Sequence, residues 1–163
     1  MRTVIVLGAA LAAALSLAAA SASGLTRPQT FSLIEVEGQE IPISGFAFDR
    51  LPRAGDAFGF VNGLYKWAGR ARGARVGHDE GICTFLRASA TEQDFFAVAH
   101  CVAQAYLPAG QILVEGFARL SEEASPFTLA VTGGTGAYAN ARGYVRIRDL
   151  ASGNSNLEFH LLP

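Results

Sequence analysis

Beyond Pro28 the chain consists of short hydrophobic and β-branched runs, and no segment keeps the 3.6-residue period of an amphipathic helix. Glycine, proline, asparagine and aspartate separate these runs, as they separate strands in all-β proteins. The pattern therefore predicts one strand after another. The predicted strands cover residues 31–37, 57–65, 71–76, 81–88, 95–106, 111–120, 127–132, 143–150 and 156–162. Residues 41–48 are predicted as a further strand or an ordered loop.

The segments between the predicted strands contain the residues that tight reversals need. Glycines in residues 108–110, 133–136 and 152–154 supply positions for positive φ. Successive strands should therefore pair antiparallel. Strands without a covering helix form a sandwich or a closed barrel, and closure removes the exposed edges. We predict an all-β fold: an antiparallel up-and-down β-barrel of about eight strands, with nine as the alternative.

Two carboxylates share one face of the first predicted strand with two hydrophobic residues. Glu35 and Glu37 alternate in step with Phe31 and Leu33. If this face points inward, burial raises the pKa of both carboxyls and makes them usable as proton donors or acceptors near neutrality. Two close carboxyls can also share a proton. The alternative is that the opposite face is buried and both carboxylates lie in solvent. Alternation alone supports either arrangement.

The N-terminus has the order of a secretory signal. Arg2 is followed by an apolar run over residues 4–20 and by small residues up to Ala22. We predict a signal peptide over residues 1–22 and a single mature domain over residues 23–163. A transmembrane anchor is the competing interpretation, but the run is short and rich in alanine. We therefore expect a secreted protein, extracellular or periplasmic, that is not attached to the membrane after cleavage.

Charge and cysteine content narrow the function classes further. The formal net charge is -1 and the arginines are scattered among acidic residues, which does not favour nucleic acid as a partner. Cys83 and Cys101 are the only cysteines, and export favours a disulfide between them. The alternative is a nucleophilic thiol, for which His100 is the one base adjacent in sequence. The histidines lack metal-ligand spacing, so no metal site is expected.

Residues 134–139 satisfy a loose G-x-G-x-x-A pattern, which raises the question of a dinucleotide site. That chemistry needs a helix N-terminus directed at the pyrophosphate. Residues 141–143 would end any helix after one turn, and a predicted strand follows. We therefore interpret Gly133, Gly134 and Gly136 as a structural glycine-rich hairpin.

The same stretch carries a family resemblance. Residues 129–143, which read LAVTGGTGAYANARG, resemble the signature of the allene oxide cyclase and dirigent superfamily. Residues 55–56, 62–65 and 81–83 follow the order and similar spacing of allene oxide cyclases. The resemblance extends from about residue 31 to the C-terminus. It implies a calycin-like eight-stranded barrel with a ligand cavity, no metal and no cofactor, and it allows a homo-oligomer, either a trimer or a dimer.

The resemblance also implies roles for individual residues. Glu35 lies where allene oxide cyclases have a cavity carboxylate, and Asn62 matches an asparagine that holds a bound water there. Glu37 replaces an asparagine, and Cys83 matches a cavity-lining cysteine. Asn62 could equally be a turn residue. The candidate catalytic residues are therefore Glu35, Glu37 and Asn62. The arginine that precedes the glycine signature in plant dirigent proteins has no counterpart.

Together these features predict a barrel that binds a small hydrophobic or phenolic molecule. The barrel would steer cyclisation or stereoselective coupling of that molecule, as a cofactor-free cyclase or isomerase or as a dirigent-type stereocontrol protein. A first alternative is a lipocalin-like carrier without catalysis. A second is a packed structural or interaction barrel that acts through its outer surface. Barrels of about eight strands can be filled or hollow, so these alternatives stay open.

Overall fold

The computed structural model describes residues 24–47, 49–68, 71–91, 95–121 and 125–163. The predicted signal peptide, residues 1–22, lies outside the described residues. The described chain forms eight strands and one short 3-10 helix, η1. In chain order these are β1 (Gln29–Ser44), β2 (Ala57–Ala68), β3 (Ala71–Ala88), β4 (Phe96–Leu107), β5 (Gly110–Ser121), β6 (Phe127–Gly134), η1 (Gly136–Tyr138), β7 (Arg142–Asp149) and β8 (Ser155–Leu162).

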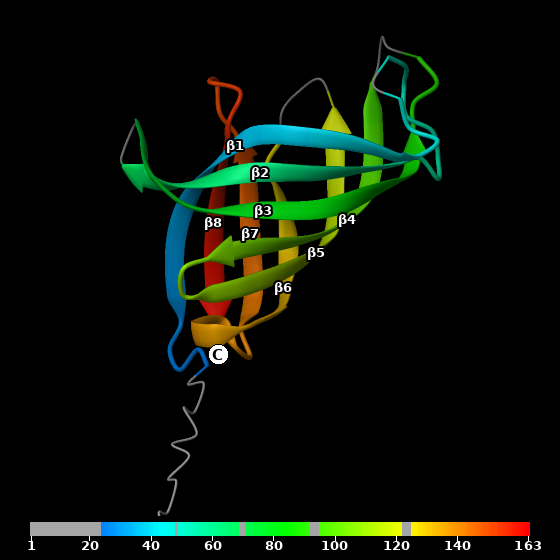
Figure 1. Ribbon diagram of the computed structural model, residues 1–163. Helices are drawn as coiled ribbons and strands as arrows, with labels where there is room; N and C mark the ends of the chain where they lie inside the picture. The colour runs from blue at the N-terminus through cyan, green and yellow to red at the C-terminus, as the bar shows by residue number, and fades with distance from the viewer. Residues whose placement is uncertain (1–23, 48, 69–70, 92–94, 122–124) are drawn as a thin grey trace, which may run out of the picture.

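The strands close into one barrel in their sequence order (Figure 1). Each strand pairs antiparallel with the next, and β8 pairs with β1. The prediction of an all-β, eight-stranded antiparallel barrel is therefore confirmed. The described residues form no ninth strand because two pairs of predicted runs are continuous: residues 71–76 and 81–88 belong to β3, and residues 31–37 and 41–44 belong to β1. A register shift between Val36 and Gln39 bends β1 without ending it.

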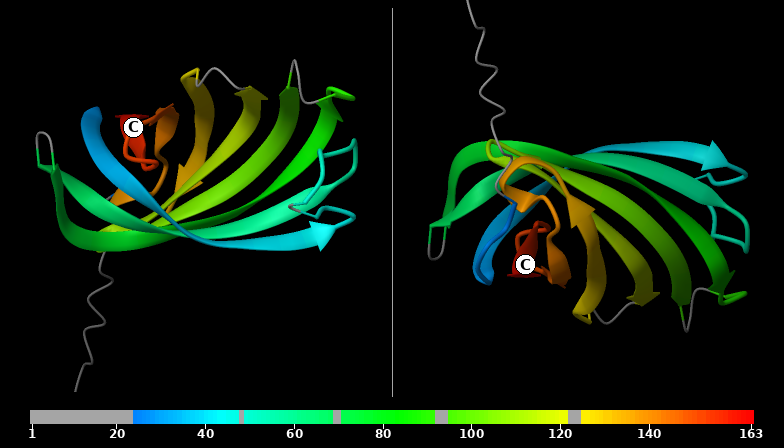
Figure 2. Two further views of the ribbon diagram at one scale, coloured as in Figure 1. Left: turned by 90° about the horizontal axis from the view of Figure 1, so that it is seen from above. Right: turned by 90° about the horizontal axis from the view of Figure 1, so that it is seen from below.

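The barrel interior contains two hydrophobic clusters at opposite ends. The end where β4 turns into β5 is filled by a large buried cluster that includes Leu64, Ile112 and Phe159. We call this the closed end. The other end, where β1, β3 and β5 end, contains a smaller cluster around Phe85 and Cys101. We call this the open end, and Figure 2 shows the strands spreading apart toward it.

Small side chains line the open end. On β4 they occupy the inward positions, and larger side chains occupy the outward positions. Ala97, Ala99 and Cys101 are all 5% exposed or less. On the opposite side, β1 pairs with β8 only as far as Glu35, and then continues with β2 alone. The small inward residues and the early separation of β1 from β8 together leave space inside this end of the barrel.

The glycine-rich segment connects the antiparallel strands β6 and β7 through η1. Gly136 has a φ of 59° and begins η1, whereas Gly133 and Gly134 belong to strand β6. A Cβ on Gly134 would lie 2.4 Å from the carbonyl oxygen of Tyr138 and 2.6 Å from that of Gln111. Glycine at 134 is therefore required by the close approach of neighbouring backbone, and only Gly136 of the three supplies a positive φ.

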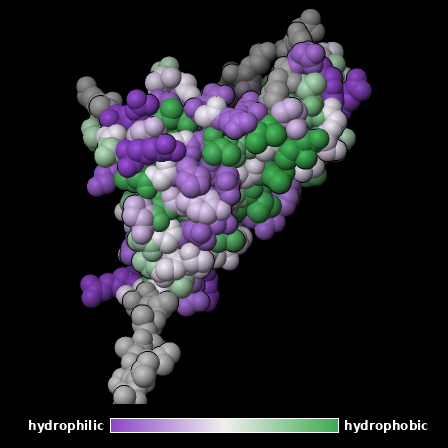
Figure 3. All heavy atoms as spheres, in the orientation of Figure 1, coloured by the Kyte–Doolittle hydropathy of each residue, from purple (hydrophilic) through white to green (hydrophobic). Residues whose placement is uncertain are grey.

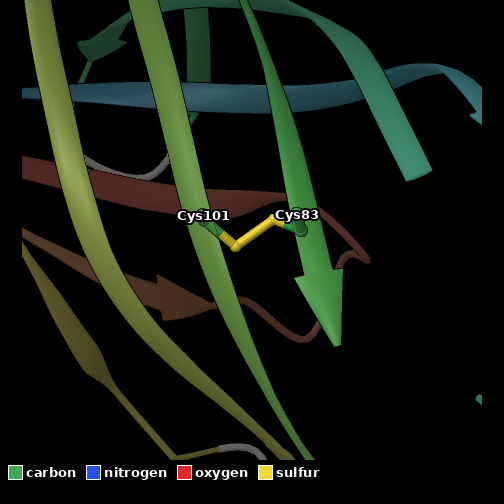
Figure 4. The surroundings of a disulfide bond; sticks show 2 residues. All are labelled: Cys83 and Cys101. Atoms are coloured by element: carbon green, nitrogen blue, oxygen red, sulfur yellow. A yellow bond between two sulfur atoms is a disulfide. The ribbon is translucent and has the colours of Figure 1, made fainter. Parts of the chain in front are cut away.

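The structure contains the disulfide between Cys83 and Cys101 (Figure 4). The two residues lie directly opposite each other on β3 and β4. Both line the interior cavity at the open end. Since no described cysteine is free, neither sulfur is available as a nucleophilic thiol.

The outer surface is unusually apolar over part of the barrel. Hydrophobic side chains gather on the outside of the wall formed by β1 to β5 (Figure 3). Ile82 and Val102 are each 50% exposed and Phe117 is 61% exposed. Within the described residues, no helix is both long and apolar enough to cross a bilayer.

Candidate functional site

Glu35 points into the barrel. Leu33, on the same face of β1, is buried in the closed-end cluster, and the ring of Phe31 stacks on that of Phe159 with centroids 5.0 Å apart. Ile34, on the opposite face, is buried as well, so burial alone would not have decided the orientation of the strand. The cavity lining decides it, because Glu35 borders the interior cavity.

Asn62 holds Glu35 in place from the neighbouring strand. Its Nδ2 donates a hydrogen bond to Glu35 Oε1 at 2.9 Å. Its Oδ1 accepts a hydrogen bond from the backbone N–H of Gly38 at 3.0 Å. Gly38 lies in the stretch of β1 where the register shifts, so the irregularity in β1 orients the Asn62 amide. Asn62 lies in the middle of β2 and is not a turn residue.

Asp79 completes the group, and the sequence did not single it out. It lies directly opposite Asn62 on β3 and is 7% exposed. Burial raises the pKa of the Asp79 carboxyl to about 9, and the charge of Glu35 and a hydrogen bond between the two carboxyls add to this. At neutral pH Asp79 therefore carries a proton.

A misleading turn signal explains why Asp79 was missed. Residues 77–81 read Gly-His-Asp-Glu-Gly, a composition typical of a turn, and residues 77–80 separated two predicted strands. In the structure β3 runs straight through this segment, and Asp79 shares its inward face with Cys83 and Phe85. Treating residues 71–88 as one strand and following its alternation would have placed Asp79 inside the barrel.

Three further carboxylates lie at the mouth of the cavity, where β1 separates from β8. Glu37 and Glu40 extend from β1 and Asp149 extends from the end of β7. Asp149 Oδ1 accepts a hydrogen bond from the Ser155 hydroxyl at 3.1 Å. Burial and the nearby Glu37 raise the pKa of the Glu40 carboxyl. Glu37 is an exposed residue of the mouth, apart from the half-buried Glu35 and the buried Asp79.

The cavity between these groups has a volume of about 270 Å³. Aromatic rings of Phe58, Phe60 and Phe127 form part of its wall, and small residues of β4 and β5 form another part. A smaller cavity of about 50 Å³ is lined by Glu35, Asp79 and Phe60 among others. The barrel is therefore hollow at the open end, and its carboxyl pair borders the empty space.

This arrangement suits general acid–base chemistry. Two carboxyl groups lie side by side and Asp79 carries its proton, so one group can accept a proton while the other donates one. The aromatic and aliphatic wall lowers the local polarity and strengthens these interactions. Among the described residues, no three histidine, cysteine, aspartate or glutamate side chains are placed to hold a metal ion.

Comparison with known protein families matches residues 61–160 to the allene oxide cyclase barrel like domain. The match includes Asn62, Asp79, both cysteines and the glycine-rich segment. A search of curated proteins found no match.

Solved structures share the fold over most of the chain. Pyocyanin demethylase is 27% identical, with a TM-score of 0.65 over 82% of this chain and 100% of that protein. AbnU, an exo-specific intermolecular Diels-Alderase, is 14% identical, with a TM-score of 0.61 over 82% of this chain and 97% of that protein. A pterocarpan synthase dirigent protein is 20% identical, with a TM-score of 0.54 over 82% of this chain and 86% of that protein. At these identities the last two demonstrate the fold alone.

Proposed function

The chain belongs to the allene oxide cyclase barrel like family, and on this basis we propose that it is a secreted, cofactor-free barrel that steers the cyclisation or coupling of a small apolar or phenolic molecule. The molecule binds in the cavity at the open end. The Glu35–Asp79 pair moves the protons that the reaction requires. The observation that carries this proposal is the carboxyl pair at the wall of a hollow lumen, in which Asp79 is buried and Glu35 is half-buried.

The pair can act without a net change of charge. Glu35, as the carboxylate, accepts a proton from an acidic position of the bound molecule. Asp79, as the acid, donates a proton to an oxygen or carbon where electron density develops. Asn62 is a positioning residue, because its amide holds Glu35 Oε1 and is itself held by the backbone of β1.

The cavity wall supplies the steric control. Phe58, Phe60 and Phe127 provide flat apolar surfaces for an aromatic or polyene ligand. The volume of about 270 Å³ is at the lower end for small-molecule sites, which favours a compact or folded ligand over an extended one. Holding a reactive molecule in one folded shape is how a barrel favours a single product.

Native mass spectrometry of the protein from its own culture medium tests the proposal. A mature chain that begins at Ser23, has one disulfide and carries a small aromatic or apolar molecule is the expected result. The co-purified compound, or its unstable precursor, then serves as the substrate for turnover measurements. Glu35→Gln should abolish turnover and leave affinity for the compound nearly unchanged. Glu158→Gln, on the outer wall, is the matched control.

Two results would favour the alternatives. A bound compound whose affinity and fate are unaffected by Glu35→Gln would identify a lipocalin-like carrier. A secreted protein that carries no compound and binds none from a small-molecule library would indicate an interaction module. In either case the carboxyl pair would have no catalytic role.

The 27% identity to pyocyanin demethylase, which extends over the whole of that protein, supports a second candidate function. In this alternative the lumen accepts a phenazine-type ring system and the protein demethylates it. Incubation with pyocyanin, followed by mass spectrometry of the products, tests this directly. Recovery of unchanged pyocyanin at high protein concentration would exclude it.

The apolar outer wall supports a homo-oligomer, a trimer or a dimer, as a further part of the proposal. Ile82, Val102 and Phe117 would be covered by a second copy of the chain. Light scattering coupled to size-exclusion chromatography measures the mass in solution. A monomer at micromolar concentration would contradict this part and leave the lumen proposal unaffected.

A further inference from the structure

The lumen has an excess of negative groups without a counter-charge. Glu35, Glu37, Glu40 and Asp149 all line the cavity. No lysine, arginine or histidine lines it in the part of the chain that the structure describes. The basic residues of β7 lie outside, since Arg146 and Arg148 alternate with the inward-facing Ile147. A ligand that enters this cavity therefore meets a negative potential focused by apolar walls.

A second observation lies deeper in the same space. Asp79 is 7% exposed, and its Oδ1 has no hydrogen-bond donor among the described residues. In the smaller cavity, Asp79 interacts with the side chain of Glu35. A buried polar oxygen without a donor costs free energy that a donor on a ligand can offset. The deep end of the lumen is therefore prepared for N–H or O–H groups.

The wall of the same cavity is partly aromatic. Phe58, Phe60 and Phe127 line it together with the carboxylates of the mouth. The faces of aromatic rings attract cations, and more strongly where water is excluded. A planar cation could therefore stack on these rings while its N–H groups approach the carboxyls.

Building on the proposed ligand-binding lumen, we propose that the cavity selects a planar aromatic cation that carries N–H donors, such as an aromatic amidinium or aminium, over neutral and anionic analogues. The charge of Glu37, Glu40 and Asp149 attracts the cation at the mouth. The Glu35–Asp79 pair accepts its N–H groups at depth. The same charges repel carboxylates, so anionic analogues should bind most weakly.

A series of three ligands with the same ring system and nearly the same shape tests the proposal. The probes are 2-naphthamidine, 2-naphthamide and 2-naphthoate, which differ in charge from +1 to -1. Binding to the oxidised mature protein is measured by titration calorimetry at pH 7 and low salt. We expect 2-naphthamidine to bind at least about tenfold more tightly than 2-naphthamide, and 2-naphthoate to bind most weakly. In about 1 M salt the advantage should shrink, because exposed charges at the mouth are screened.

Two charge-matched triple variants locate the effect. The lumen variant combines Glu37→Gln, Glu40→Gln and Asp149→Asn. It should weaken 2-naphthamidine binding by about tenfold and leave 2-naphthamide binding nearly unchanged. The control removes the same number of charges from the outer wall. It combines Glu80→Gln, Glu115→Gln and Glu158→Gln, and it should bind all three probes as the unmodified protein does. Thermal melts check that both variants fold, and Glu37→Gln alone, at an exposed position, repeats the test with minimal disturbance.

The outcomes separate this proposal from the proposed function. If 2-naphthamide or 2-naphthoate binds as tightly as 2-naphthamidine, the cation preference is wrong, while a lumen for neutral ligands still stands. If the lumen variant keeps full affinity for 2-naphthamidine, the cation binds elsewhere and the proposal is overturned. If none of the probes binds and no compound co-purifies with the protein, both proposals fail.

Discussion

The two ends of the barrel are built from the same alternation of inward and outward residues, yet they serve different purposes. At the closed end the inward positions carry large residues, and Leu64, Ile112 and Phe159 are 2% exposed or less. At the open end the inward positions of β4 carry alanine and cysteine, and those of β1 to β3 include Glu35, Asn62 and Asp79. The comparison shows that side-chain volume at alternate positions divides one barrel into a packed half and a hollow half.

The division has an energetic consequence. The packed half buries apolar surface without polar groups and contributes most of the hydrophobic stabilisation. The hollow half contains a buried carboxyl whose ionisation is suppressed, which makes the folded state less tolerant of high pH. Stability is therefore concentrated at one end, and a chemically useful but costly site lies at the other.

The largest expected effect comes from truncating the packed half. Phe159→Ala removes a ring that is 2% exposed and should lower the free energy of unfolding by about 3–5 kcal/mol. The matched change Phe58→Ala enlarges a cavity that already exists and should cost only about 1–2 kcal/mol. Urea denaturation of both variants measures the difference. Equal losses would mean that the open end is as tightly packed as the closed end.

The disulfide stabilises the hollow half, where packing is weakest. Replacing Cys83 and Cys101 by alanine together opens a loop whose ends are 18 residues apart and should lower the free energy of unfolding by about 3 kcal/mol. Denaturation with and without reductant checks this, because reductant should destabilise the unmodified protein to a similar extent and leave the double variant unaffected. A reductant-insensitive unmodified protein would show that the cysteines are not joined in solution.

The buried acid should produce a pH-dependent loss of stability. The pKa of Asp79 is about 9 in the folded chain against an ordinary value of 3.8, so between these pH values the folded state holds a proton that the unfolded state releases. The stabilisation of the folded state by this proton is fully present below pH 3.8 and is lost as the pH rises through about 9. The slope is at most about 1.4 kcal/mol for each pH unit.

Asp79→Asn tests this slope. Asparagine resembles the protonated acid in shape and cannot ionise, so the variant should be more stable than the unmodified protein at pH 8, with a flatter stability profile. Asp49→Asn, in the exposed loop after β1, is the matched control and should leave the profile unchanged. Parallel profiles for the Asp79 variant and the unmodified protein would show that Asp79 is ionised in the fold.

The smallest expected effect concerns two adjacent glycines at the closed end. Gly134→Ala would place a methyl group 2.4 Å from the Tyr138 carbonyl oxygen and should cost about 1–3 kcal/mol. Gly133→Ala meets no atom within 4 Å and has no positive φ, so it should be neutral or stabilise by up to about 1 kcal/mol. Thermal melts compare the two variants. Equal effects would mean that the backbone around η1 can move aside.

Local information in the sequence was sufficient for the class of fold. Alternation, turn residues and the lack of a helical period predicted an antiparallel barrel, and the two cysteines predicted a disulfide. These features depend on neighbours one or two residues apart or on simple composition. Alternation also placed Glu35 and Glu37 on one face of the first predicted strand.

Only the tertiary structure decided which faces are interior and which polar groups meet. Glu35, Asn62 and Asp79 come from three strands, and their contact depends on strand register and on the irregularity of β1 around Gly38. Register is a property of paired strands, and a segment such as residues 77–81 resembles a turn until pairing holds it extended. The pKa of Asp79 likewise arises from surroundings contributed by distant parts of the chain. The sequence by itself determined that a barrel forms. Closure of the barrel decided that it is hollow at one end and that Asp79 lies where burial keeps its carboxyl protonated.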